Sequence, residues 1–172
     1  MTIIVRPARP EDVDDVVDIG LTSWREGFRG VVPGDLMPDA EGLRARIRER
    51  IAERGPPIAV GELDGRVRGW ITFGASRDAD SGAAVGEIWA LNVHPDAWRH
   101  GIGRELVGYA LEQLARTPFS EVTLWTFRDT PRSRSFYEAL GFKHDGATQR
   151  RHASGGTIEV RYRLRLAPGR NA

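Results

Sequence analysis

The sequence predicts a single α/β domain in which a mixed β-sheet of about seven strands is covered by about four helices, on both faces. Three observations support this prediction. The chain has 172 residues, enough for one well-packed domain without disulfides or metal ions. Its strand-like and helix-like segments follow the order β-α-α-β-β-β-α-β-α-β-β. A hairpin leads into a strand, a helix and another strand, an order typical of a crossover between parallel strands.

The first third of the chain predicts one short strand and two helices. The strand is expected at residues 3–8, IIVRPA. Pro10 suits the first turn of a helix, and the acidic residues that follow it favour the positive end of the helix dipole. Apolar residues then recur at helical spacing as far as Trp24, and we expect this helix to end within residues 27–30. A second helix is expected over about residues 39–54, where a Gly-Pro-Pro sequence ends it.

The middle of the chain predicts the centre of the sheet. Two β-type segments, 57–63 and 66–76, flank Asp64-Gly65, a dipeptide typical of tight hairpin turns. Residues 85–93, VGEIWALNV, form a nearly continuous apolar run, so we expect a central strand that is buried on both faces. The later elements are expected to be a helix over about 101–115, a strand at 121–127, a helix at 131–140, and strands at 142–150 and 157–166.

These elements are expected to form one domain over residues 1–168, followed by a frayed tail at 169–172. The apolar run at the start of the sequence is too short for a signal peptide, and no stretch approaches the length needed to span a bilayer. We therefore expect a cytoplasmic protein without membrane contact. The absence of cysteine excludes disulfides, thiol nucleophiles and Cys-ligated zinc, and the four histidines lack metal-ligand spacing, so no metal site is expected.

The formal net charge of +1 hides an uneven distribution of charge. Residues 141–172 hold seven basic residues against two acidic ones. Arg161, Arg163 and Arg165 would share one face of a strand, and we interpret them as alternating, solvated arginines. The alternative is a nucleic-acid-binding surface. The low net charge and the lack of interleaved aromatic residues weigh against it, so no nucleic-acid partner is expected.

A turn between the central strand and the following helix predicts a phosphate-binding site. The apolar strand ends before Pro95, and the glycines of Gly101-Ile102-Gly103 open a helix. Glycines let successive backbone N–H groups point into one concavity, and a helix N-terminus adds free donors and partial positive charge. The alternative is that both glycines only permit a tight turn, because a single G-x-G is a weak signal.

Two segments in order resemble the acetyl-CoA-binding motifs of the GNAT superfamily of N-acetyltransferases. WRHGIG, residues 98–103, is similar to the signature Q/R-x-x-G-x-G/A, and Val93-His94-Pro95 resembles the strand end that precedes it. LWTFRDTPRSRSFYEALGF, residues 124–142, resembles the block that ends in FYxxxGF. Trp98 replaces the usual Gln or Arg, Thr130 replaces an Asn and Ser133 replaces an Ala. The first change is tolerable if the turn acts through backbone amides.

The resemblance implies the GNAT fold, in which two parallel central strands splay apart to admit the cofactor; here these are 85–93 and 121–127. It also implies direct transfer of an acetyl group from acetyl-CoA to an amine. The residues expected to contact acetyl-CoA are Leu91, Asn92, Val93, Trp98, Arg99, His100, Gly101, Ile102, Gly103, Arg104, Thr130, Ser133 and Tyr137.

Two side chains are expected to move protons. The resemblance places Tyr137 beside the thioester sulfur, where a phenol that stays protonated at pH 7 can act as general acid. The alternative is that Phe136-Tyr137 is plain packing. Glu87 is the candidate base, because burial within an apolar strand would raise its pKa towards a useful range. The alternatives are an exposed carboxylate or one paired with an arginine. In this family the position of the base varies, and water can replace it.

The acceptor pocket is expected to involve Trp24, Phe28, Arg29, Trp70, Trp89 and Trp125, although core packing would also explain most tryptophans. Arg29 or Arg128 could hold a substrate carboxylate or remain solvated. We expect a small-molecule primary amine as substrate, with a homodimer as one option for assembly. The alternatives are acetylation of a protein N-terminus or lysine, and a non-catalytic acyl-CoA-binding module.

Overall fold

The computed structural model describes residues 1–36, 39–52, 57–151 and 155–166, and every structural statement below refers to these residues. The expected tail at 169–172 lies outside them. The predicted order of strands and helices is confirmed, with three short 3-10 turns added. The elements are β1 (Ile3–Pro7), α1 (Val13–Gly27), α2 (Ala40–Ala52), β2 (Ile58–Leu63), β3 (Arg66–Ala75), β4 (Val85–Val93), α3 (Ile102–Ala115), β5 (Glu121–Phe127), α4 (Pro131–Ala139), β6 (Lys143–Arg151) and β7 (Thr157–Arg165).

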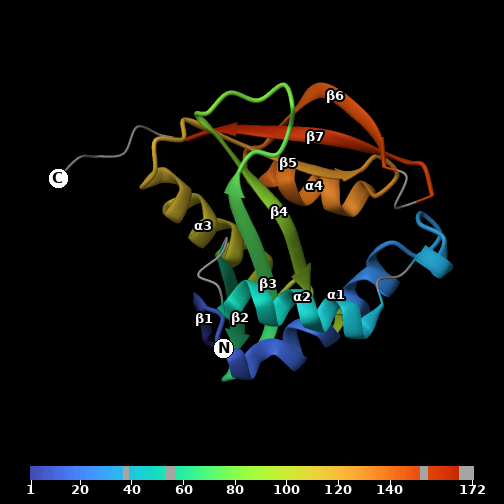
Figure 1. Ribbon diagram of the computed structural model, residues 1–172, viewed down its shortest axis with the longest axis vertical. Helices are drawn as coiled ribbons and strands as arrows, with labels where there is room; N and C mark the ends of the chain where they lie inside the picture. Colours follow the sequence, from blue (N-terminus) through green and yellow to red (C-terminus); the bar gives the residue numbers. More distant parts are fainter. Residues whose placement is uncertain (37–38, 53–56, 152–154, 167–172) are drawn as a thin grey trace.

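All seven strands belong to one mixed sheet with the order β1-β2-β3-β4-β5-β7-β6. Strands β4 and β5 are parallel, with α3 as the crossover between them, and the other neighbouring pairs are antiparallel. Figure 1 shows β1 and β2 at one end of the molecule and β6 and β7 at the other. Strand β7 lies between β5 and β6, so the last strand of the chain fills an interior position in the sheet.

Helices cover both faces of the sheet, as the sequence predicts. On one face α3 packs Ile102, Leu106 and Ala110 against the strands, and residues of α4 extend the same cluster. On the other face α1 and α2 pack against a second cluster that includes Trp70 of β3. The two clusters use opposite faces of β2, because side chains alternate along a strand. Within the described residues no helix is long and apolar enough to cross a membrane.

The sheet opens between β4 and β5. Their parallel pairing runs only from Val85↔Glu121 to Ile88↔Leu124. Beyond it, β4 stays paired with β3 and β5 stays paired with β7. A β-bulge sets this point, because Thr72 pairs with Ala90 and the next residue, Phe73, pairs with Ile88, which leaves Trp89 as the extra residue. The splay implied by the family resemblance is therefore present, and it begins at the bulge.

Two sequence-based interpretations need correction. Only the first half of β4 is fully buried, because the half that follows the bulge borders the opening between the strands. Arg161 is not solvated: it is 6% exposed and binds Asp78, Asp80 and Asp145 at 2.7 to 3.0 Å. The alternation of the strand was right, but the loop between β3 and β4 folds over this face of β7 and buries it.

Candidate active site

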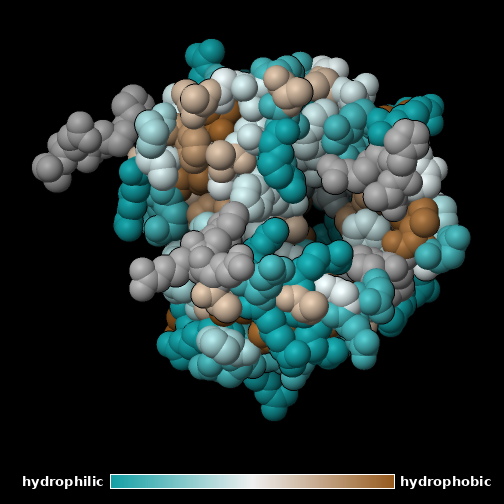
Figure 2. All heavy atoms as spheres, in the orientation of Figure 1, coloured by the Kyte–Doolittle hydropathy of each residue, from teal (hydrophilic) through white to brown (hydrophobic). Residues whose placement is uncertain are grey.

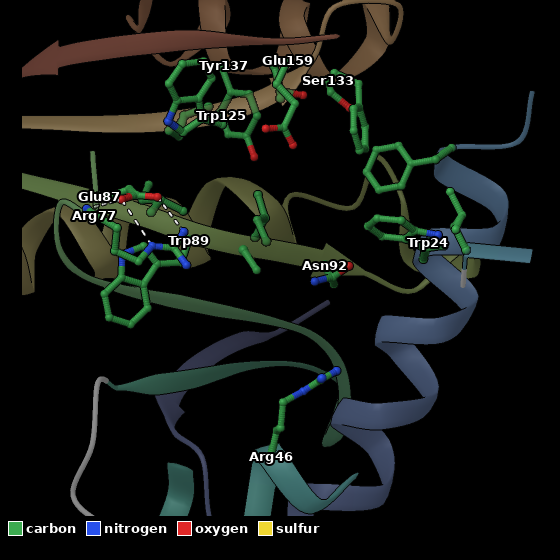
Figure 3. A pocket seen from close by; sticks show the side chains of 18 residues that line it. Trp24, Arg46, Arg77, Glu87, Trp89, Asn92, Trp125, Ser133, Tyr137 and Glu159 are labelled. Atoms are coloured by element: carbon green, nitrogen blue, oxygen red, sulfur yellow. Dashed lines mark hydrogen bonds and ion pairs between the residues drawn. The ribbon is translucent and has the colours of Figure 1, made fainter. Parts of the chain in front are cut away.

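A cavity of about 450 Å³ occupies the opening between β4 and β5. Figure 3 shows it between the strands, α1, α2 and α4, and Figure 2 shows the surface hollowed between α4 and the α1–α2 pair. Its walls come from six helices and strands and from two connecting segments. The lining residues are Trp24, Phe28, Leu36, Arg46, Arg77, Glu87, Ile88, Trp89, Ala90, Leu91, Asn92, Leu124, Trp125, Thr126, Phe127, Ser133, Tyr137 and Glu159.

One wall of the cavity is aromatic. Trp24 lies in the last turn of α1 and Phe28 directly follows this helix, with ring centroids 4.9 Å apart. Phe28 packs edge-on against Phe127 at 4.8 Å. The structure thus brings Trp24 and Phe28 into the cavity wall. Arg29 does not line the cavity: its side chain is 72% exposed and pairs with Glu26 at 2.6 Å.

Trp89 and Trp125 also line the cavity, but each is held by other protein groups. The Trp89 Nε1 donates to the carbonyl of Ala75 at 3.2 Å, and the Arg77 guanidinium lies 5.0 Å from the ring centroid. The Trp125 Nε1 donates to Asp78 at 2.8 Å. Two further candidates lie elsewhere. Trp70 is buried under α1, and the exposed Arg128 pairs with Asp129.

The hydroxyl of Tyr137 points into the cavity from α4 (Figure 3). The ring packs between Phe136 and Phe142, with centroid distances of 5.1 and 6.0 Å. Its hydroxyl has no hydrogen-bond partner in the described part of the chain. Burial raises the pKa of the Tyr137 phenol, because the charged phenolate would lose solvation. The geometry therefore presents a protonated, unengaged donor to the cavity.

Glu87 is both buried, as the role of base would require, and paired with an arginine, which was one of the alternatives. It is 2% exposed, and its carboxylate is paired with Arg77. One carboxylate oxygen accepts from the Arg77 backbone N–H at 2.8 Å and the other accepts from Nη2 at 2.6 Å. A proton taken up by Glu87 would have to compete with these bonds, or arrive while Arg77 has moved, since Arg77 itself is 54% exposed.

A second carboxylate, Glu159 of β7, also lines the cavity, and Figure 3 shows it on the same side as Tyr137. It is buried and accepts a hydrogen bond from Gln149 at 2.7 Å. Sequence reasoning missed Glu159, Arg77 and Arg46 as site residues. The signal for Glu159 was a carboxylate inside the alternating run TIEVRY, which resembles the signal used for Glu87. No local pattern marked the two arginines.

The turn before α3 has the backbone geometry of an anion-binding site. Arg99 and Gly101 have positive φ angles of 67° and 91°, and Gly101 caps the helix. The N–H of Glu105 makes the first helical bond, to the carbonyl of Gly101 at 3.1 Å. Within the described residues, the N–H groups of residues 99–104 meet no protein acceptor. Such donors, together with the helix dipole, suit a pyrophosphate.

Side chains around this turn hold it in place or add positive charge. The Trp98 Nε1 donates to the carbonyl of Val93 at 2.8 Å, and the Arg132 guanidinium stacks 3.6 Å from the Trp98 ring centroid. His100 Nδ1 lies 3.0 Å from the carbonyl of Trp98. Arg99, Arg104 and Arg132 have no carboxylate partner within the described residues.

The remaining cofactor candidates contribute through the backbone or through small size. Ile102 is fully buried, so only its backbone faces the turn. A Cβ on Gly103 would lie 3.2 Å from the Phe136 ring, so this glycine allows α3 and α4 to pack closely. The Thr130 hydroxyl donates to the carbonyl of Phe127 at 2.7 Å, whereas Ser133 lines the cavity. Leu91 and Asn92 line it from the open edge of β4, which leads from the turn to Tyr137.

A family model described as "Acetyltransferase (GNAT) family" matches residues 21–142. The chain is 26% identical over 137 residues to YuaI, an uncharacterized N-acetyltransferase of Bacillus subtilis, covering 80% of this chain and 78% of that protein. It is 33% identical over 91 residues to the mycothiol acetyltransferase of Kocuria rhizophila, a match to 52% of this chain but only 30% of the relative.

Solved structures agree on the fold. The structure of YncA of Salmonella typhimurium with acetyl-CoA superposes with a TM-score of 0.73 at 20% identity, covering 97% of this chain and 95% of that one. A ribosomal-protein-alanine N-acetyltransferase of Brucella melitensis gives a TM-score of 0.76 at 19% identity, covering 95% and 99%. Together with the match to the family model, this places the chain in the acetyltransferase (GNAT) family, as an acetyl-CoA-dependent acyltransferase.

Proposed function

We propose that the enzyme transfers the acetyl group of acetyl-CoA directly to the primary amine of a small molecule. The observation that supports this most is the cavity of about 450 Å³ where the strands part, with the Tyr137 hydroxyl facing into it. Its volume lies in the range of small-molecule sites. The chain has no cysteine that could carry an acetyl group, which agrees with direct transfer.

The residues present fit the donor. The acceptor-free N–H groups of residues 99–104 suit its pyrophosphate, and Arg99, Arg104 and Arg132 add positive charge nearby. The open edge of Leu91–Val93 suits the amide-rich pantetheine arm, which can pair with it like an added strand. Ser133 lies where that arm would reach the cavity. Bound in this way, acetyl-CoA supplies an acetyl group activated as a thioester.

The chain's own side chains then handle protons. A primary amine is almost wholly protonated at pH 7, so a base must take one proton from it, directly or through water. Two buried carboxylates face the cavity, and we keep Glu87 as the candidate base with Glu159 as its competitor. Tyr137 holds its proton on the phenol oxygen and donates it to the sulfur that leaves, and the further proton that the nitrogen loses as the amide forms returns to the phenol oxygen through water. The aromatic wall around Trp24 excludes water from the amine.

The test is a turnover screen with acetyl-CoA, in which release of the free thiol is followed across a panel of small amines and short peptides. We expect turnover with at least one small amine, and stabilisation of the fold by acetyl-CoA in a thermal melt. Turnover with peptides and with no small amine would mean that the acceptors are proteins. Unchanged melting in millimolar acetyl-CoA, together with no turnover of any amine, would contradict the proposal.

A further inference from the structure

Three arginines gather at the α2 side of the cavity. Arg46 of α2 lines the cavity and points into it from below in Figure 3. Arg50, one helical turn further along α2, lies 5.6 Å from the Trp89 ring centroid, and Arg77 lies 5.0 Å from the same ring. Trp89 therefore lies beside two of the three guanidinium groups. Arg46 and Arg77 line the cavity itself, whereas Arg50 lies outside the lining and adds its charge from beside the Trp89 ring.

Most of this positive charge is not neutralised by the protein. Arg77 is paired with Glu87, but Arg46 and Arg50 have no carboxylate partner within the described residues. By contrast, Arg44 on the same helix pairs with Asp14 at 3.0 Å. Burial, together with the charges of Arg77 and Arg46, lowers the pKa of Arg50, as expected where like charges lie close together. An anion bound at this edge would relieve that repulsion.

The opposite side of the cavity carries the opposite charge. Glu159 of β7 and the Tyr137 hydroxyl enter from the side that faces Arg46 (Figure 3). Trp24 and Phe28 form an aromatic wall of the same cavity. Figure 2 shows hydrophilic side chains around the hollow on the α2 side. The cavity thus has a carboxylate on the side of the proposed acid, an aromatic wall, and on the α2 side Arg46, which has no carboxylate partner within the described residues.

We propose that the acceptor is an amine that also carries an anionic group, a carboxylate or a phosphate-type group, which Arg46 binds at the α2 edge with Arg50 adding positive charge. The amine then faces Tyr137 and Glu159, and the body of the acceptor lies along the aromatic wall. This inference rests on the proposed transfer of an acetyl group to a small amine. A purely cationic acceptor, such as a polyamine, would place a charged group against unpaired arginines and should be a poor substrate.

The test compares matched acceptors of equal length that end in a carboxylate, a phosphonate or a neutral amide. We expect kcat/KM to be at least about 10-fold higher for an anionic acceptor than for the neutral one, as one charge-assisted hydrogen bond would give. Added salt should raise KM for the anionic acceptor only. The ratio of kcat/KM for the carboxylate acceptor to kcat/KM for the phosphonate acceptor identifies which anion the subsite prefers.

Variants then locate the subsite. Arg46→Gln should lower kcat/KM for the anionic acceptor by about 10- to 100-fold and leave the neutral amide within about 2-fold. Arg48→Gln is the matched control, because Arg48 is exposed on the same helix and does not line the cavity. It should change neither value. Arg46→Lys should recover part of the loss. All three should melt like the wild type, since these side chains are exposed.

Binding of the N-acetylated anionic product, measured by calorimetry without acetyl-CoA, gives a readout independent of turnover. It should weaken in Arg46→Gln and not in Arg48→Gln. Equal kcat/KM for anionic and neutral acceptors, or equal losses in both variants, would overturn the inference while leaving the acetyltransferase function intact. Absence of turnover with every amine would count against the proposed function instead, and the calorimetric comparison would still decide whether Arg46 binds an anion.

Discussion

The two ends of the site are built in different ways. The turn that precedes α3 uses backbone N–H groups from one continuous segment, 99–104, and the left-handed conformations of Arg99 and Gly101 orient them. The acceptor cavity uses side chains from α1, α2, α4 and three strands. Backbone donors tolerate changes of side chain, as Trp98 illustrates, whereas every substitution in the cavity changes its shape or charge. The donor end can therefore stay constant while acceptor specificity changes.

The largest effect is expected at the acceptor end, from Tyr137→Phe. This change keeps the ring packing and removes only the hydroxyl, so turnover should fall by about 10²- to 10⁴-fold. Melting temperature and affinity for CoA should stay near those of the wild type. Burial raises the pKa of Tyr137, so the acidic form persists below that raised value and is lost only as pH climbs through it. The difference between variant and wild type should therefore persist to about pH 10. A fall smaller than a few-fold would remove Tyr137 from the role of general acid.

The two carboxylates offer the next comparison. Glu87→Gln should lower turnover by about 10²-fold, most strongly at low pH, where less of the amine is already neutral, and should leave CoA binding intact. Glu159→Gln is the matched variant, since both carboxylates are buried in the same cavity. The measurement is kcat as a function of pH for both. If the pH profile of kcat is unchanged in Glu87→Gln but changed in Glu159→Gln, Glu159 is the general base and Glu87 is not.

Arg161→Gln tests what holds the loop wall of the cavity. Removing this buried cation leaves Asp78, Asp80 and Asp145 close together and should cost about 3 kcal/mol in the free energy of unfolding. The hydrogen bond from Arg161 lowers the pKa of Asp80, so the stabilisation is full above the ordinary aspartate pKa, declines below it and is lost as pH falls through the lowered pKa. Denaturant titrations of wild type and variant should therefore give a larger difference in the free energy of unfolding at about pH 7 than at about pH 3. Equal losses of unfolding free energy at both pH values would mean that Arg161 stabilises the fold through packing and not through its charge.

The smallest effect is expected at the donor end. Gly101 has a φ of 91° and its Cβ position is only loosely contacted, so Gly101→Ala strains the backbone without a serious clash. The strain, about 1–2 kcal/mol, should weaken CoA binding by about 10-fold and leave the acceptor KM nearly unchanged. Gly108→Ala is the control: this glycine lies in the middle of α3 with nothing near its Cβ position, and the change should stabilise the helix. Unchanged CoA affinity in Gly101→Ala would show that the turn can re-form around a side chain.

The sequence predicted the parts of the molecule that depend on local order. The strand and helix bounds and the turn at 98–103 follow from periodicity and from short motifs read within one segment. Arg161 was misinterpreted because the alternation of side chains predicts which face of a strand a residue is on. It does not predict whether another segment covers that face. The exposure of the second half of β4 depends on the bulge at Trp89, and the nearly continuous apolar run of residues 85–93 contains no residue pattern that marks a bulge. Arg46 lies on the polar side of α2, where sequence alone cannot distinguish a solvent-facing arginine from one that borders a cavity.

The interior position of β7 has a consequence for how the chain matures. Among the described strands β7 is translated last, yet it joins β5 to β6 and carries both Glu159 and Arg161. Until it inserts, the nascent chain presents the bare edge of β5, a template for pairing with other chains. Its pairing with β5, Glu121↔Arg165 to Phe127↔Glu159, spans more than thirty residues of sequence, and contacts of such separation form slowly. The turn before α3 precedes β5, α4, β6 and β7 in the chain, so the backbone of the donor end is synthesised well before the last wall of the acceptor cavity.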